Sequence, residues 1–174
     1  MTGVTGDAVT AALGNASYVA EEASAGLSFP GIFARFAQGY FERYGDHSAT
    51  LARIAAKNHA NGARNPLAHL RRDFGFDFCN TVSDKNPMVA APLRKTDCSP
   101  VSDGAAALVL RSAERSGGAR RAVRFRATAH VNDYLPMSRR DFTACEGPRR
   151  AWQMALQRAG NSVNDLSFAE VHDC

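Results

Sequence analysis

The four cysteines are the side chains with the widest chemical scope in this sequence, because a thiolate can act as a nucleophile or a metal ligand and two thiols can form a disulfide. Cys79, Cys98, Cys145 and Cys174 lie far apart, and no CxxC pair occurs among them. The spacing therefore indicates neither a zinc site nor a disulfide framework, and we expect no metal ligands. Four cysteines without a secretory signal favour a reducing compartment.

Two further polar residues stand in short motifs. His172 follows the apolar run 166–171, and a histidine at the end of a strand most often hydrogen-bonds the backbone. Ser99 precedes Pro100, and this dipeptide by itself predicts a turn. The residues alone therefore give neither position a chemical role.

The chain is moderately basic, with 21 Lys and Arg against 17 Asp and Glu and a net charge of +4. Its basic pairs are spread along the chain, as is typical of solvated faces; the alternative is a site for an anionic ligand. We expect no nucleic-acid partner, because neither interleaved aromatic residues nor a binding motif accompanies the charge. The pairs are Arg71-Arg72, Arg120-Arg121, Arg139-Arg140 and Arg149-Arg150.

The composition is that of a soluble globular protein, with 174 residues of which 45% are hydrophobic and 22% charged. No stretch approaches the ~18 consecutive apolar residues of a membrane span. Met1–Val4 opens without the basic start and apolar run of a secretory signal. We therefore expect a cytoplasmic protein with no membrane partner.

The elements that must position the candidate residues begin with an irregular segment over 1–27, which is rich in small residues and has little periodicity. Apolar residues at helical spacing then predict a helix through Phe33–Tyr44. Pro30 suits the first turn of this helix and Gly45 suits its end. The aromatic residues of its stripe are predicted to pack in the core.

A second helix follows. Asp46 or Ser48 can cap it, and it is predicted to continue to about Gly62, after which Asn65-Pro66 can start a short third helix. Between residues 74 and 100, repeated prolines break every regular period, so we expect a long ordered loop. Loops of that length in compact domains are usually functional.

The last third of the chain predicts strands and one helix. A continuous apolar run over 105–110 predicts a buried strand, and the alternation over 123–131 predicts a strand with one less buried face. Gly147-Pro148 opens a helix that ends near Gly160, and 166–171 predicts another strand. Three strands are too few for a stable sheet covered on both faces, so part of the sheet is expected to be missing.

Two segments resemble the thiolase superfamily. Asp97–Ala107 has the sequence DCSPVSDGAAA and is similar to the NASGxxDGAA signature of thiolases. Glu170–Cys174 has the sequence EVHDC and resembles the HDCF form of the sterol-carrier-protein-type branch. Between them, 147–160 resembles the GPxxA helix of the family, while Lys57–His59 and Asn65-Pro66 resemble its loop domain. The resemblance covers the chain from about residue 28 onward.

The resemblance implies an α/β fold, with a helical, loop-rich domain and parts of two mixed-sheet αβα halves. Residues 1–96 would form the coenzyme A-binding loop domain. Residues 97–118 would supply the last strand and helix of the N-terminal half, and residues 119–174 the start of the C-terminal half.

Thiolases exchange acyl groups with coenzyme A through a cysteine thioester. Their nucleophilic cysteine lies upstream of the matched region, and a Gly-His-Pro histidine and a second cysteine lie downstream. None of these motifs occurs here, so the resemblance implies an internal fragment that does not turn over by itself. Cys98, Cys145 and Cys174 match no nucleophile position and are expected to be packing or surface residues.

The resemblance also assigns roles to single residues. His172 matches the position that helps to form an oxyanion hole for the acetyl-CoA enolate, which would make it catalytic. Ser99 matches the serine beside the pantetheine arm of coenzyme A, and Cys98 and Pro100 would line the same tunnel. The family has Asn at the position of Asp97 and Gly at that of Pro100, so the local hydrogen bonds differ here.

Coenzyme A thioesters are the implied substrate, with no permanently bound cofactor. Arg71, Arg72 or Arg94 could contact the 3′-phosphate of coenzyme A through charge-assisted hydrogen bonds, and spacing alone does not choose among them. The family implies a homo-oligomer, either a dimer or a tetramer.

The predicted function of the parent protein is thiolase-type acyl transfer, either as an acetyl-CoA acetyltransferase or as a 3-ketoacyl-CoA thiolase. The alternative is a non-catalytic protein that binds acyl-CoA or lipid, which would keep the pantetheine region without needing a thiolate.

Overall fold

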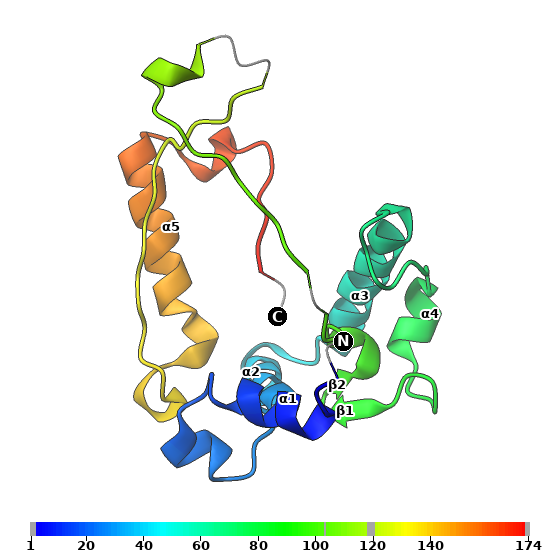
Figure 1. The fold of residues 1–174 in the computed structure, drawn as a ribbon. Helices are drawn as coiled ribbons and strands as arrows, with labels where there is room; N and C mark the ends of the chain where they lie inside the picture. The colour runs from blue at the N-terminus through cyan, green and yellow to red at the C-terminus, as the bar shows by residue number, and fades with distance from the viewer. Residues whose placement is uncertain (1–2, 103, 118–120, 173–174) are drawn as a thin grey trace. The chain divides into compact units, whose positions relative to one another are not determined.

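The computed structural model describes residues 3–102, 104–117 and 121–172 (Figure 1). The chain divides into two compact units. Unit 1 consists of residues 3–102 and 135–143, and unit 2 consists of the described residues in 104–134 and 144–172. In the part of the chain that the structure describes, no helix combines the length and apolar character needed to cross a lipid bilayer.

Unit 1 is mainly helical, with one small antiparallel sheet in which β1 pairs with β2. Its regular elements are α1 (Gly6–Gly14), a π-helix (Val19–Ala23), α2 (Phe29–Tyr44), α3 (Ser48–Arg64), α4 (Gly75–Asn80), β1 (Met88–Ala90), β2 (Leu93–Arg94) and the 3-10 turns Lys95–Asp97 and Met137–Arg139. The sequence predicted no regular element before residue 28, so α1 and the π-helix are additions to the predicted fold.

Helix α2 confirms the first predicted helix at both ends. The Ser28 hydroxyl accepts a hydrogen bond from the Gly31 amide at 3.2 Å, Pro30 lies in the first turn, and Gly45 follows the last residue. The phenylalanines of the aromatic stripe are half-buried and not fully buried in the core. The rings of Phe33 and Phe36 stack with centroids 5.9 Å apart, whereas the tyrosines near the end of the helix are exposed.

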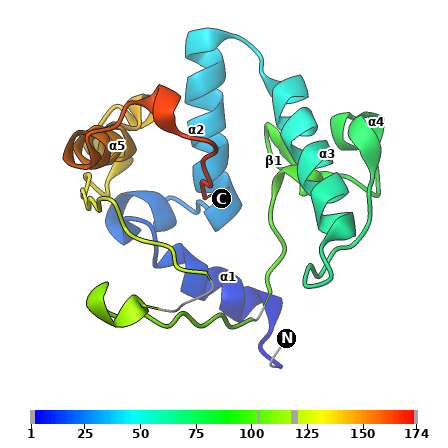
Figure 2. The ribbon, with the colours of Figure 1, turned by 90° about the horizontal axis from the view of Figure 1, so that it is seen from above.

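Helix α3 confirms the second predicted helix, and α3 and α4 lie side by side (Figure 2). The predicted cap at Asp46 or Ser48 is corrected, because His47 occupies the cap position and its side chain makes no cap hydrogen bond. Asp46 lies one residue before the cap, and its carboxylate accepts a hydrogen bond from the Ser48 amide at 2.8 Å. Ala52, Ala55 and Cys79 form the core between α3 and α4. The small alanines allow α4 to pack close to α3, and the rings of Phe74 and Phe78 cover this core.

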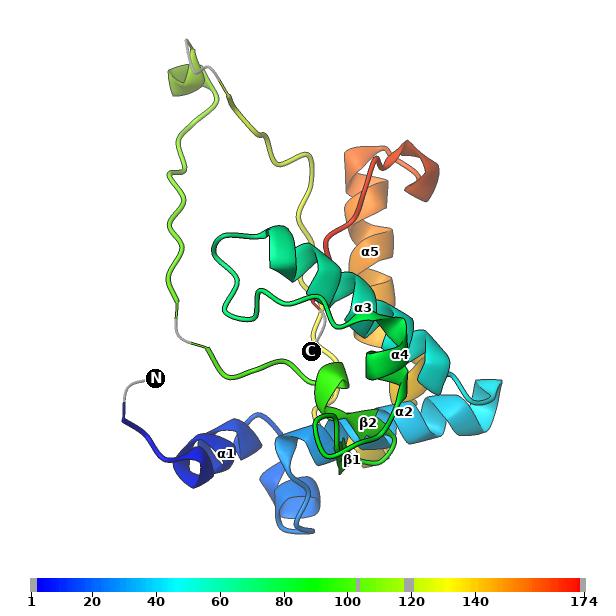
Figure 3. The same cartoon turned by 90° about the vertical axis from the view of Figure 1, so that its right-hand side faces the viewer.

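The third predicted helix is absent, and this prediction is wrong. Asn65 instead forms a turn in which its side-chain oxygen accepts a hydrogen bond from the Leu67 amide at 2.9 Å. An asparagine that bonds the backbone two residues ahead competes with helical hydrogen bonding, which explains the turn. The predicted loop over 74–100 is ordered but contains α4 and the hairpin β1–β2, which packs against α2 (Figure 3).

Residues 135–143 pack against helix α2 although they are distant from it in sequence. The ring centroids of Phe36 and Phe142 lie 4.9 Å apart. A Cβ at Gly39 would lie 2.9 Å from the Phe142 ring, so the absence of a side chain there permits this close approach. Arg43 also forms an ion pair with Asp141 at 2.8 Å.

Unit 2 is built around α5 (Glu146–Ala159), which confirms the helix predicted after Gly147-Pro148. Gly160 ends it in the left-handed conformation, with φ of 66°. Arg158 donates a hydrogen bond to the Thr128 carbonyl at 2.7 Å and thereby fixes the preceding segment to the helix. The other regular elements are the 3-10 turns Glu114–Ser116 and Val163–Asp165, and Phe142–Ala144 forms a further 3-10 turn where the two units join in sequence.

The strands predicted over 105–110, 123–131 and 166–171 are not formed among the described residues, which corrects the prediction. Their apolar side chains are exposed, for example Val109 at 93% and Phe125 at 76%. A strand needs hydrogen-bonded neighbours and a covered apolar face, and these segments have neither here. The structure is thus helix-rich with one small sheet, which is compatible with part of an α/β fold.

Candidate functional site

The candidate site is the segment from Cys98 to Pro100, which follows the 3-10 turn Lys95–Asp97. The Cys98 amide donates a hydrogen bond to the Lys95 carbonyl at 3.3 Å and so closes the turn. Cys98 is half-buried, whereas Ser99 and Pro100 are exposed. The chain therefore presents the exposed Ser99 immediately after an ordered turn of unit 1.

Arg94 holds this turn from within unit 1. Its backbone amide and its Nε both donate hydrogen bonds to Asp97 Oδ2, at 2.8 Å and 3.0 Å. Its Nη1 donates to Asn80 Oδ1 at 3.2 Å, and its Nη2 donates to the Ser48 carbonyl at 2.6 Å. The side chains of Arg94 and Asp97 are only 4% and 2% exposed. The guanidinium therefore connects the start of α3, the end of α4 and the turn before the site.

Asn86 makes a second buried connection. Its side chain is fully buried, and its Nδ2 donates to the carbonyls of Phe78 and Thr81, each at 3.1 Å. Its Oδ1 accepts a hydrogen bond from the Thr96 amide at 3.0 Å. Buried amides that satisfy several backbone groups in this way fix the relative positions of the segments they join.

The thiol next to the site is not activated. Burial raises the pKa of Cys98, and the neighbouring carboxylate of Asp97 raises it further. Burial likewise raises the pKa of Cys79, which is fully buried in the core of unit 1. Both thiols are therefore protonated at neutral pH, whereas a nucleophilic cysteine needs its pKa lowered.

Arg94 was one of three arginines considered for contact with a phosphate, and the structure corrects that assignment, because its guanidinium is buried and engaged with Asp97, Asn80 and Ser48. Arg71 and Arg72 are both exposed.

Arg72 lies over a ring close to the core of unit 1. Its guanidinium carbon is 5.0 Å from the centroid of the Phe74 ring. On α3, Arg53 has the same relation to Phe76 at 5.6 Å. Nothing in the sequence indicated this second cation–π contact, because a single arginine on the exposed side of a helix belongs to no motif.

His172 is exposed and lies outside regular structure in unit 2, whereas Ser99 belongs to unit 1. The roles implied by the resemblance would place both residues against one coenzyme A thioester, and this convergence stays a prediction. Cys174 lies outside the described residues. Cys145 is exposed and immediately precedes α5, a position where no function was predicted.

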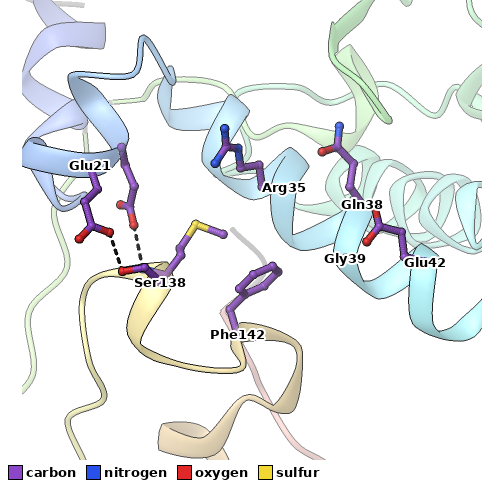
Figure 4. A pocket seen from close by; sticks show the side chains of 9 residues that line it. Glu21, Arg35, Gln38, Gly39, Glu42, Ser138 and Phe142 are labelled. Atoms are coloured by element: carbon purple, nitrogen blue, oxygen red, sulfur yellow. Dashed lines mark hydrogen bonds between the residues drawn. The ribbon is translucent and has the colours of Figure 1, made fainter.

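A pocket of about 380 Å³ lies elsewhere in unit 1, between α2 and the segment 135–143 (Figure 4). Its acidic groups already hold this segment: Glu22 accepts a hydrogen bond from the Met137 amide at 2.9 Å, and Glu21 accepts one from the Ser138 hydroxyl at 2.6 Å. None of the predicted site residues lines the pocket. Its lining residues are Glu21, Glu22, Arg35, Gln38, Gly39, Glu42, Met137, Ser138 and Phe142.

No protein-family model matches the chain. Curated proteins do. An acetyl-CoA acetyltransferase from Methanothermobacter thermautotrophicus is 34% identical over 169 residues, which are 95% of this chain and 43% of that protein. Sterol carrier protein 2 from Oryctolagus cuniculus is 28% identical over 83% of this chain and 27% of its own length. Benzoylsuccinyl-CoA thiolase subunit BbsB from Thauera aromatica is 25% identical over 85% of this chain and 38% of its own length.

The chain belongs to the thiolase superfamily. The family resemblance is thereby confirmed, and the matches extend well beyond the two motifs, over 83–95% of this chain. This chain spans less than half the length of each of these three relatives.

Proposed function

We propose that this chain is the coenzyme A-binding part of a thiolase-type acyltransferase, which exchanges acyl groups between coenzyme A thioesters. The observation that carries the proposal is the exposed Ser99, held at the end of a turn by buried polar contacts within a family motif. The names of the relatives support acyl-CoA chemistry. Family analogy further suggests a cytoplasmic homo-oligomer.

Ser99 is proposed to hydrogen-bond an amide of the pantetheine arm. A hydroxyl both donates and accepts, so it can pair with either the N–H or the C=O of such an amide. Cys98 and Pro100 flank it and would supply apolar surface to the same arm. The raised pKa of Cys98 suits this packing role, because a neutral thiol behaves as a small apolar group.

Arg72, or its neighbour Arg71, is proposed to bind the 3′-phosphate. Both arginines are exposed, so their guanidinium groups remain available to a ligand. The Phe74 ring beside Arg72 restricts the side chain and lowers the entropy that it loses on binding.

His172 is proposed to be catalytic. It would hydrogen-bond the oxygen that gains negative charge when an enolate forms from the acetyl thioester. A donor fixed at such an oxygen typically lowers the barrier by ~3 to 4 kcal/mol, because no reorganisation is needed as the charge develops. The chain alone is expected to show no turnover, because Cys79 and Cys98 have raised pKa values and no cysteine matches the nucleophile position.

A second candidate function is binding of acyl-CoA or lipid without catalysis. Such a protein would keep the exposed Ser99 segment and would need no thiolate. Thioester exchange by the complete gene product with acetyl-CoA separates the two functions. Exchange that is lost in His172→Ala, with coenzyme A affinity retained, supports the enzyme; affinity without any exchange supports the binder.

Binding to the chain itself tests the proposed site. Isothermal titration calorimetry should show that Ser99→Ala weakens coenzyme A about fivefold, which is the usual value of one neutral hydrogen bond. Arg72→Ala should weaken coenzyme A but leave 3′-dephospho-coenzyme A unchanged. The exposed residues Ser112 and Arg124 of unit 2 supply matched alanine controls. Equal affinity of the wild type and Ser99→Ala would remove Ser99 from the site.

A further inference from the structure

The residues that hold the Ser99 segment are themselves buried and cannot contact a ligand. The side chains of Arg94 and Asp97 are 4% and 2% exposed. We infer that this ion pair is a positioning device: it sets the backbone from which Ser99 reaches the pantetheine arm. The inference rests on the proposed function, and it adds two residues that act through Ser99.

Asp97 is close enough in sequence to set the direction of Ser99. Its Oδ2 accepts from both the amide and the Nε of Arg94, which joins the last residue of the 3-10 turn to the residue that precedes the turn. Ser99 follows two residues later, so a change in the turn is carried directly into the backbone torsions at Cys98 and Ser99. Between Asp97 and Ser99 the chain has one residue, Cys98, whose amide donates to the Lys95 carbonyl at 3.3 Å.

Arg94 fixes the turn to the rest of unit 1. Its Nη1 and Nη2 reach Asn80 and the Ser48 carbonyl, groups that belong to two different helix ends. A planar guanidinium can make these bonds at the same time because its donors point in fixed directions, whereas a lysine ammonium cannot span them. The start of α3 and the end of α4 thus act as the fixed frame for the site.

The two oxygens of Asp97 differ in a way that gives a clean test. Both donors of Arg94 reach Oδ2, while Oδ1 is buried and accepts no hydrogen bond from the described residues. An asparagine can place its carbonyl oxygen at the Oδ2 position and so keep both hydrogen bonds without the negative charge. Asp97→Asn therefore preserves the geometry, and Asp97→Ala removes it.

The experiment measures binding of coenzyme A and of pantetheine, which lacks the nucleotide, to the complete chain. If Asp97→Ala leaves about a tenth of the molecules with the segment in its binding conformation, both dissociation constants rise about tenfold. Asp97→Asn should stay within about threefold of the wild type, because the hydrogen bonds that direct the turn are retained. A merely electrostatic role would give the same loss in both variants.

Asp165→Ala is the matched control. Asp165 closes an exposed 3-10 turn of the same length in unit 2, where it accepts from the Ser162 amide at 2.7 Å and from the Ser162 hydroxyl at 2.8 Å. Its removal should change neither dissociation constant. Hydrogen exchange at the Cys98 amide, which donates to the Lys95 carbonyl, adds a second readout. It should accelerate in Asp97→Ala and remain unchanged in Asp165→Ala.

The outcomes separate the inference from the proposed function. A wild-type chain that binds neither ligand overturns the proposed function, and with it the role of the ion pair in binding. A wild-type chain that binds both, with Asp97→Ala equally tight, overturns the inference alone. So does weakening of coenzyme A without weakening of pantetheine. If Asp97→Ala does not fold, Arg94→Lys replaces it with the same expected loss, because it keeps the cation but not the guanidinium fork.

Discussion

The two units of this chain differ in how far their backbone polar groups are hydrogen-bonded within the unit. In unit 1, helices satisfy their own hydrogen bonds, and the buried side chains of Asn86 and Arg94 satisfy the carbonyls that remain between them. In unit 2, only α5 is regular over any length, and the segments with strand-like sequences expose residues such as Val109. A helix completes its hydrogen bonds within one segment, whereas a strand depends on another strand.

The difference also separates the candidate residues. Ser99 extends from a region whose geometry is fixed by contacts within its own unit. His172 ends a segment that has strand-like sequence and no strand neighbour among the described residues. The binding role of Ser99 can therefore be tested on this chain, while the catalytic role of His172 requires the complete gene product.

Arg94→Ala should produce the largest loss and would sharpen the contrast between the units. It leaves the Asp97 carboxylate buried without its partner, a change that typically lowers the free energy of unfolding by ~3 to 5 kcal/mol. Urea denaturation monitored by circular dichroism measures this free energy.

The control is Arg126→Ala in unit 2, whose exposed guanidinium reaches the Ala159 carbonyl only at 3.5 Å. Its denaturation midpoint should match that of the wild type. If the two variants lose equal stability, the buried network does not distinguish unit 1.

Gly39→Ala is expected to have an intermediate effect, and it tests whether residues 135–143 truly belong to unit 1. The new methyl group would lie 2.9 Å from the Phe142 ring and push that ring from α2. Overpacking of this kind costs about 1–3 kcal/mol, partly offset by the roughly 1 kcal/mol that alanine contributes over glycine within a helix. The midpoint of thermal unfolding should fall.

The same substitution in a Phe142→Ala background should raise the midpoint, because the clash is gone and the helix preference remains. A fall of equal size in both backgrounds would show that Phe142 does not pack on Gly39. The segment would then not be part of unit 1.

The sequence predicted the elements whose signals are local. Helices α2, α3 and α5 have periodic apolar residues, and α2 and α5 also have a cap or stop residue, Ser28 and Gly160. Helix α4 was missed because six residues are too few to show a helical period. The strands were predicted from patterns that are correct for a sheet, but a pattern cannot supply the neighbouring strands that a sheet requires.

The sequence predicted the motif that contains the candidate site, but it did not predict the buried contacts that hold this motif in place. Ser99 was found because its neighbours match a known signature. Arg94 stayed among the three arginines considered for the phosphate, because its Ser48 partner is 46 residues away in the sequence and only the fold brings them together. Its buried position also explains why the exposed Arg71 and Arg72 remain the better candidates for binding a phosphate.

Phe125→Lys should have the smallest effect, and it is the most direct way to break the contrast between the units. Phe125 is 76% exposed, so replacing it removes little buried apolar surface. Substitutions at such positions usually change the free energy of unfolding by less than about 0.5 kcal/mol. Ala52→Lys is the opposite case, because Ala52 is fully buried between α3 and α4 and a charge cannot be accommodated there. Urea denaturation of both variants measures the difference. A large fall in the free energy of unfolding of Phe125→Lys would mean that the segment 121–131 packs in solution. Unit 2 would then bury its apolar side chains as unit 1 does.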